Sequence, residues 1–126
     1  MAEPDIVNVT SIKGQTQAIA VGTSVTDLVA VTPADKIYKM NMLLISNVHA
    51  TDAATITLTL NRSTALSGVV TTGSFHIAKS ISIPAGATLD VLSKPLYLME
   101  GDKIVGQASA ASSLESVASY EVIDDA

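Results

Sequence analysis

Residues 53–61 constrain the fold of this chain most strongly, because apolar and polar side chains alternate there from Ala54 to Asn61. Successive side chains on a β-strand point to opposite faces, so this period of two predicts a strand with one apolar face. The other face is mostly threonine, which suits a solvated sheet face or a polar contact between subunits. The apolar row is Ala54, Ile56, Leu58 and Leu60, and the polar row is Thr55, Thr57, Thr59 and Asn61.

Similar short segments recur along the chain, each bounded by turn-forming residues. We expect an all-β fold, a single antiparallel β-sandwich that is jelly-roll-like, with about ten short strands and no significant helix. Residues 1–5 are predicted to be a flexible N-terminal arm, and residues 6–126 a single domain. The predicted strands cover residues 6–13, 15–21, 24–32, 37–49, 53–61, 75–83, 88–92, 96–99, 103–110 and 116–123.

The segment 37–49 is the longest apolar run. A strand that is apolar on both faces is either central in a packed sheet or covered by a second subunit. A helix is the competing interpretation, but the segment has no helix caps. On a strand, Met40, Met42 and Leu44 would share one face, and Leu43 and Ile45 the other.

Two further strands have faces that the pattern assigns. In segment 24–32, Val25, Val29 and Val31 would share a face. In segment 75–83 the inward row would be Phe75, Ile77, Ile81 and Ile83, and Lys79 interrupts it, which predicts a β-bulge there. The uncharged stretch Ser63 to Gly73 lacks alternation and predicts a long loop, of the kind that often contacts a partner.

The last third of the chain, residues 95–124, is predicted to form three consecutive strands that close one sheet. Glu100-Gly101-Asp102 forms the first turn, where Gly101 can adopt a positive φ at no steric cost. Residues 49–52 are predicted to be a hairpin connection, and Pro84 to Ala87 a turn.

Composition excludes several classes of site. The chain has no cysteine, so it has no disulfide, no thiolate metal ligand and no cysteine nucleophile. Its net charge of −5 argues against a nucleic-acid partner, which needs clustered Lys and Arg. Only 15% of residues are charged while 48% are apolar, which favours either an assembled subunit or simply a small β domain with a threonine-rich face. We expect neither a signal peptide nor a membrane span.

The titratable residues show no catalytic or metal-binding spacing. His49 and His76 are the only histidines, and a site would need a carboxylate such as Asp27 or Asp52 beside one of them. We therefore predict no catalytic, cofactor-binding or metal residues, and no enzyme. The other carboxylates are predicted to be solvated on turns, polar faces or the terminal tail: Asp90, Glu100, Asp102, Glu115, Glu121, Asp124 and Asp125.

Four runs of residues near the C-terminus carry a resemblance. They are residues 83–86 (Ile-Pro-Ala-Gly), 95–104 (Pro-Leu-Tyr-Leu-Met-Glu-Gly-Asp-Lys-Ile), 107–110 (Gln-Ala-Ser-Ala) and 117–123 (Val-Ala-Ser-Tyr-Glu-Val-Ile). In these runs the chain resembles small virion structural proteins of tailed bacteriophages, of the capsid decoration (cement) or tail- and neck-associated type. The resemblance implies a small β-sandwich that is a component of the virus particle.

From this resemblance we expect a non-enzymatic structural protein of the virion, assembled in the host cytoplasm. The leading hypothesis is a capsid decoration or cement protein that forms a homo-oligomer, such as a trimer, and binds the major capsid protein or another virion protein. Residues 1–5 and 63–73 are the predicted shell-facing elements. The alternatives are a tail, neck or fibre-associated subunit, a carbohydrate- or receptor-binding module, and last a small glycan hydrolase. No cofactor, nucleic acid or membrane is expected as a partner.

Overall fold

The computed structural model describes residues 9–63 and 72–124, which form nine β-strands and no helix. The bounds are β1 Ser11–Val21, β2 Thr26–Val29, β3 Lys36–Asn47, β4 Ala54–Arg62, β5 Gly73–Ile83, β6 Thr88–Asp90, β7 Leu96–Leu98, β8 Asp102–Ala108 and β9 Leu114–Asp124. The predicted arm at residues 1–5 and most of the predicted loop at 63–73 lie outside the described residues.

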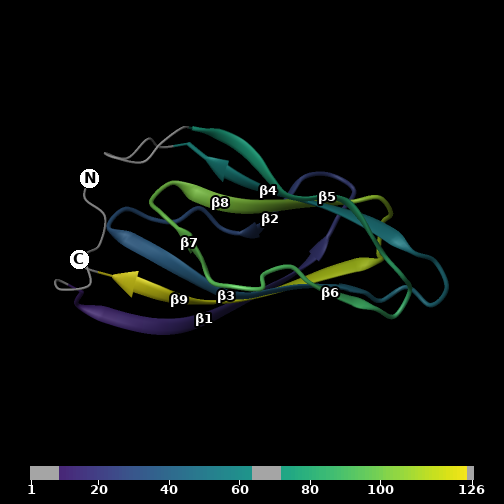
Figure 1. Cartoon of the computed structure of the whole chain (residues 1–126), viewed down its shortest axis with the longest axis horizontal. Helices are drawn as coiled ribbons and strands as arrows, with labels where there is room; N and C mark the ends of the chain where they lie inside the picture. Colours follow the sequence, from purple (N-terminus) through teal and green to yellow (C-terminus); the bar gives the residue numbers. More distant parts are fainter. Residues whose placement is uncertain (1–8, 64–71, 125–126) are drawn as a thin grey trace.

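The strands form two antiparallel sheets that lie one above the other (Figure 1). Sheet A has the order β1-β9-β3-β6, with β7 also paired to β3, and sheet B has the order β2-β8-β4-β5. The pairs are nested along the chain: β1 with β9, β2 with β8, β3 with β6 and β7, and β4 with β5. This nesting is the jelly-roll topology. The predicted all-β sandwich is confirmed, with nine strands in the described residues.

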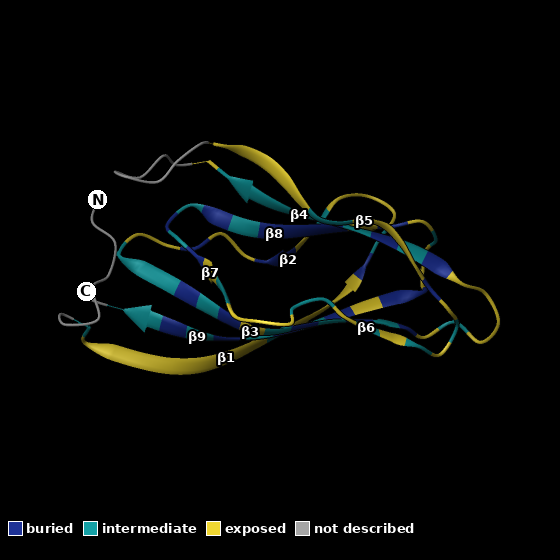
Figure 2. Cartoon of the chain, in the orientation of Figure 1, coloured by how far each residue is buried: buried dark blue, intermediate teal, exposed yellow. Residues whose placement is uncertain are grey.

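The core lies between the two sheets, where the inward side chains of β3, β4, β8 and β9 are almost fully buried (Figure 2). Two tyrosines stand out in it: the Tyr38 and Tyr120 rings pack with centroids 4.7 Å apart. Burial raises the pKa of both phenols, and that of Tyr120 is raised further by Tyr38 and lowered by a hydrogen bond from Gln15. The largest fully buried side chains are Tyr120, Leu28, Met40, Leu43, Ile45, Ile56, Leu58, Ile83, Leu98, Ile104, Leu114 and Val21.

Strand β4 is placed as its alternation predicts. Ala54, Ile56 and Leu58 are buried, while the threonines between them lie on the outer face of sheet B. Two turns are also confirmed: Gly86 has φ +77° in the turn after Pro84, and Gly101 has φ +85° before β8.

The first strand differs from the sequence-based expectation. Gly14 was expected to end one strand, yet it lies within the continuous strand β1, opposite Glu121 of β9. Its φ is not positive, and the partner strand β9 extends the full length of β1, so no turn forms. Residues 6–8 of the predicted first strand lie outside the described residues.

The structure also assigns strands to sheets differently from the sequence-based prediction. Strands β7, β8 and β9 were expected to close one sheet, but β8 belongs to sheet B while β7 and β9 both pair with β3 in sheet A. Residues 49–52 were expected to form a hairpin, but they cross from β3 in sheet A to β4 in sheet B. Alternation along one strand shows which side chains share a face and carries no information on the neighbouring strand.

Bulges explain the wrong face assignments. A register shift between Met40 and Met42 inserts one residue into β3, so Met40 points inward while Met42 and Leu44 point outward. A shift between Asp27 and Val29 buries both Leu28 and Val29, and it leaves Val25 and Val31 exposed. The single valine face predicted for this segment is therefore wrong.

Strand β5 contains the bulge expected at Lys79. Its register against β4 shifts twice, and Ser80, inside the first shift, has φ +51°. However, Phe75 and Ile81, which were predicted to be inward, are 47% and 41% exposed. Strand β5 is an edge of sheet B, so nothing among the described residues covers the outer part of its inner face.

Candidate functional site: titratable clusters and uncovered surfaces

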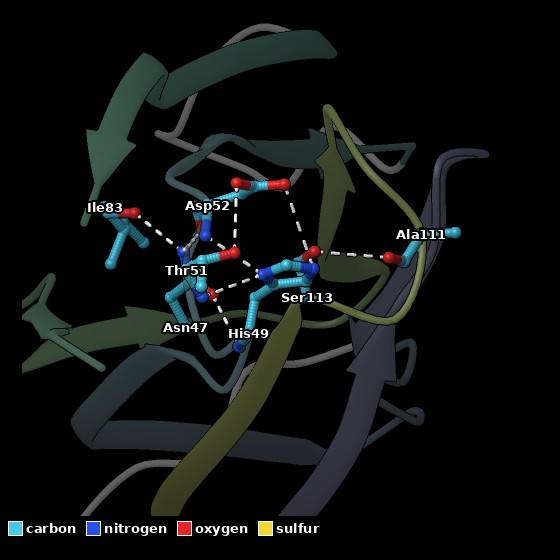
Figure 3. Close-up of polar contacts among 7 residues, drawn as sticks. All are labelled: Asn47, His49, Thr51, Asp52, Ile83, Ala111 and Ser113. Atoms are coloured by element: carbon cyan, nitrogen blue, oxygen red, sulfur yellow. Dashed lines mark hydrogen bonds and ion pairs between the residues drawn. The ribbon is translucent and has the colours of Figure 1, made fainter. Parts of the chain in front are cut away.

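The connection between β3 and β4 holds the one histidine–carboxylate pair among the described residues (Figure 3). Asn47, which is 2% exposed, fixes this connection. Its Oδ1 accepts the N–H of His49 at 2.9 Å, and its Nδ2 donates to the carbonyls of Ile83 at 2.8 Å and Asp52 at 3.0 Å. Asn47 therefore ties the end of β3 to the end of β5 in the opposite sheet.

The His49 ring is held in one tautomer. Its Nδ1 accepts the backbone N–H groups of Thr51 at 3.2 Å and Asp52 at 3.0 Å, so the neutral ring carries its proton on Nε2. A histidine in a catalytic triad needs the opposite arrangement, with Nδ1–H on a carboxylate and a free Nε2. Here Nε2 is 3.9 Å from Asp52 Oδ2, and the Asp52 side chain is 78% exposed. The contacts are those of a turn that His49 stabilises.

The second cluster lies where β4 ends and β8 begins. Arg62 donates from Nε to Asp102 Oδ1 at 2.9 Å and from Nη2 to Asp102 Oδ2 at 2.8 Å. Asp102 is fully buried and also accepts the N–H of Met99 at 3.0 Å. Glu100 is only 8% exposed. The expectation that Glu100 and Asp102 are solvated is wrong, because the turn around Gly101 points both into the end of the sandwich.

The remaining candidate residues are dispersed. Asp27 pairs with Lys103 at 3.2 Å. Asp124 was expected in a terminal tail, but it is the last residue of β9 and pairs with Lys36 at 2.6 Å. His76 is exposed on β5. Within residues 9–63 and 72–124, no group of three His, Cys, Asp or Glu side chains lies close enough to hold a metal ion. The carboxylates Asp90, Glu115 and Glu121 are on the outer face of sheet A, and Asp125 lies outside the described residues.

The outer face of sheet A carries more apolar side chains than a solvated sheet face requires. Directly opposite residues on neighbouring strands share a face, so Ile12 of β1, Ile123 of β9 and Ile37 of β3 form a row across it. Ala18, Val117 and Leu44 form a second row. The outer face of sheet B is instead lined by the threonines of β4. The two faces of the sandwich are therefore chemically distinct.

Strand β1 is the second uncovered feature. Of its 11 residues only Val21 is buried, and Figure 2 shows nearly the whole strand as exposed. Its inward side is polar: Gln15 Nε2 donates to the Tyr120 hydroxyl at 3.1 Å, and that hydroxyl is 3.4 Å from Gln17 Oε1. Strand β1 is thus attached through β9, through Tyr120, and through Gln17 Oε1, which accepts the N–H of Ala30 at 3.3 Å. The sequence pattern, which splits this strand at Gly14, does not predict this long edge.

Comparison with known proteins identifies a solved structure that has a similar fold. No protein-family model and no curated protein sequence matches the chain. A chain in the acidic stable capsid structure of Helicobacter pylori bacteriophage KHP30 has a similar structure, with a TM-score of 0.50 and 9% sequence identity. The match covers 94% of this chain and 91% of that chain. The likeness therefore extends over the whole sandwich and shows a shared fold.

No helix that could cross a membrane occurs in the described part of the chain.

Proposed function

We propose that this chain is a non-enzymatic structural subunit of a phage particle that decorates the capsid shell. The observation that carries the proposal is the structural match to a chain of a phage capsid over nearly the full length of both. The resemblance of the C-terminal runs to phage virion proteins is a second line of support, and those runs lie in the turn after β5 and in the segments that contain β7, β8 and β9.

The surface of the sandwich supports a role in assembly. Among the described residues, His49 stabilises a turn, and Asp102 and Asp27 form ion pairs with Arg62 and Lys103. These groups are not arranged as the acid, base and nucleophile of a catalytic site. The outer face of sheet A and the edge at β1 leave apolar side chains uncovered, among them Ile12 at 56% and Ile19 at 37% exposure. Contiguous exposed apolar surface, in contrast to single exposed side chains, is typical of a protein–protein contact.

The mechanism is thermodynamic linkage. A subunit that binds the mature shell, and not its dissociated parts, stabilises the shell by mass action. Many equivalent contacts with the major capsid protein would add together, so each contact can be weak.

A test compares particles with and without the subunit. Particles stripped of the chain, or assembled in its absence, should release DNA at a lower temperature, and adding back the purified protein should restore the original value. A control protein of similar size and charge should restore nothing. Unchanged heat stability in the stripped particles would contradict the decoration role.

A tail, neck or fibre-associated position is the alternative within the same class, since the fold match does not fix the place of the subunit on the particle. The number of copies separates the two. A number comparable to that of the major capsid protein supports decoration, while a small fixed number supports a tail or neck position.

A further inference from the structure

We propose that β1 pairs with β1 of a second copy across a twofold axis at Thr16, which joins two copies of sheet A into one continuous antiparallel sheet. The inference does not depend on a role in a virus particle, because it rests on the edges of the sheets alone. It replaces the trimer expected from the resemblance with a twofold contact.

The four sheet edges differ in how they are protected against pairing. Natural proteins protect exposed edges with short strands, bulges and charges. The edge formed by β6 and β7 consists of two three-residue strands, and β2 has four residues with a register shift. Strand β5 is long, but it carries two register shifts, Lys79, and Ser80 at positive φ. Three of the four sheet edges are therefore short or irregular, which protects them against pairing with another strand.

The β1 edge has none of these features except one lysine. It is 11 residues long, pairs with β9 residue for residue without a shift, and contains no proline and no positive φ. Its free side is a row of alternating backbone N–H and C=O groups, which is a template for another strand. Among residues 9–63 and 72–124, β9 is the one strand that pairs with it.

The sequence of β1 identifies a second copy as the partner. It is nearly symmetric about Thr16: Gln15 and Gln17 flank it, and small residues, Gly14 and Ala18, come next. In an antiparallel pair centred on Thr16, Gln15 faces Gln17 of the other copy, so the two amides can hydrogen-bond. Gly14 then faces Ala18 and Ile12 faces Ala20, so each of these two pairs places a small residue opposite its partner.

The charges on the strand are compatible with this register. Lys13, the one charged residue of β1, faces Ile19 of the second copy. The two Lys13 residues stand six positions apart, or about 20 Å along the sheet, which is well beyond the Debye length at physiological salt. Like charges that directly oppose each other would destabilise the pair, and this register avoids them.

The surface area that β1–β1 pairing would bury indicates how tightly two copies should bind each other. An 11-residue edge is about 37 Å long and about 10 Å thick, so pairing covers roughly 400 Å² per copy. The total over both copies, roughly 800 Å², lies below that of standard stable interfaces. We therefore expect a weak dimer in solution that depends on concentration, and stronger pairing wherever copies are held close together.

Single-cysteine variants test the register, since the natural chain has no cysteine. In Thr16→Cys the two thiols would face each other at a Cα separation of about 5 Å, within the range a disulfide needs. Ile12→Cys is the matched control on the same strand and face, and its two copies would be about 27 Å apart. Mild oxidation should give a covalent dimer rapidly with Thr16→Cys and only slowly with Ile12→Cys.

Charge variants give a second readout by sedimentation velocity over a concentration series. The natural chain should shift from monomer to dimer, while Thr16→Lys and Thr16→Glu should each stay monomeric, and their mixture should dimerise again. Ser82→Lys on the β5 edge should dimerise like the natural chain. Should the charged variants fail to fold, the two cysteine variants alone decide. Monomer at every concentration, a trimer, or equal cross-linking of the two cysteine variants would overturn the proposal.

Discussion

Arg62 at the end of β4 forms a bidentate ion pair with Asp102 at the start of β8, and the aspartate is fully buried. The pair joins the two central strands of sheet B. A buried charge is stable in this position only while its partner and its hydrogen bonds remain in place.

Replacing Asp102 with Asn should therefore lower the free energy of unfolding by about 3–5 kcal/mol, because it removes the charge from the fully buried end of a bidentate pair with the partly buried Arg62. Asp27→Asn is the matched control, since Asp27 pairs with Lys103 on the surface of the same sheet. An exposed pair contributes at most about 1 kcal/mol. Urea unfolding of both variants checks this, and equal losses would contradict the assigned role of the buried pair.

Gly106 of β8 has no room for a side chain. A Cβ there would lie 2.7 Å from Leu28 Cδ1 and 3.2 Å from Leu58 Cδ2, both in the packed core. Gly106→Ala should cost about 1–3 kcal/mol through overpacking. Gly14→Ala, with nothing within 4 Å of its Cβ, should instead be neutral or gain up to about 1 kcal/mol. A neutral Gly106→Ala would show that Leu28 moves aside freely.

The Asn47 side chain makes three hydrogen bonds to backbone groups, and the one to the Ile83 carbonyl reaches the opposite sheet. Asn47→Ala would leave the buried carbonyl of Ile83 without its donor, at a cost of about 1–3 kcal/mol for each unsatisfied buried group. Asn41→Ala, on the exposed bulge of the same strand, should change stability by less than about 0.5 kcal/mol. Chemical denaturation distinguishes the two, and similar stability of both variants would contradict the cross-sheet role.

The two core tyrosines predict a loss of stability in alkali. Burial raises the pKa of Tyr38 above its ordinary value of 10.0, so the folded chain keeps a proton that the unfolded chain releases. The stabilising contribution is complete below that ordinary pKa and is lost as the pH rises above it. Tyr38→Phe should flatten this loss, and Tyr97→Phe, on an exposed ring, should not. Denaturation midpoints measured from neutral to alkaline pH check this, and identical slopes for all three proteins would contradict it.

The sequence predicts which face of a strand is buried where apolar and polar residues alternate strictly. It does not predict this where the conformation of a strand depends on residues distant in the chain. Strand β4 could be placed because Ile56 and Leu58 alternate with threonines, and the bulge at Lys79 because the charge interrupts an apolar row. The bulge between Met40 and Met42 leaves no mark in the sequence, because apolar residues follow one another on both sides of it. It becomes visible only through the register with β9.

The burial of Asp102 was missed for a similar reason. A Glu-Gly-Asp turn has the composition of a solvated turn, and its environment is decided by Arg62, which lies 40 positions away in the chain. The β1 edge was missed because Gly14 has the sequence signature of a strand end. Its actual conformation is set by β9, a strand from the other end of the chain.

Locating the subunit in a reconstruction of purified particles tests the central claim most directly. We expect density for a two-sheet sandwich on the outside of the shell, in contact with the major capsid protein, at a copy number set by the symmetry of the shell. Absence of the chain from purified particles would contradict the proposed function, and a position confined to the tail would contradict the decoration role.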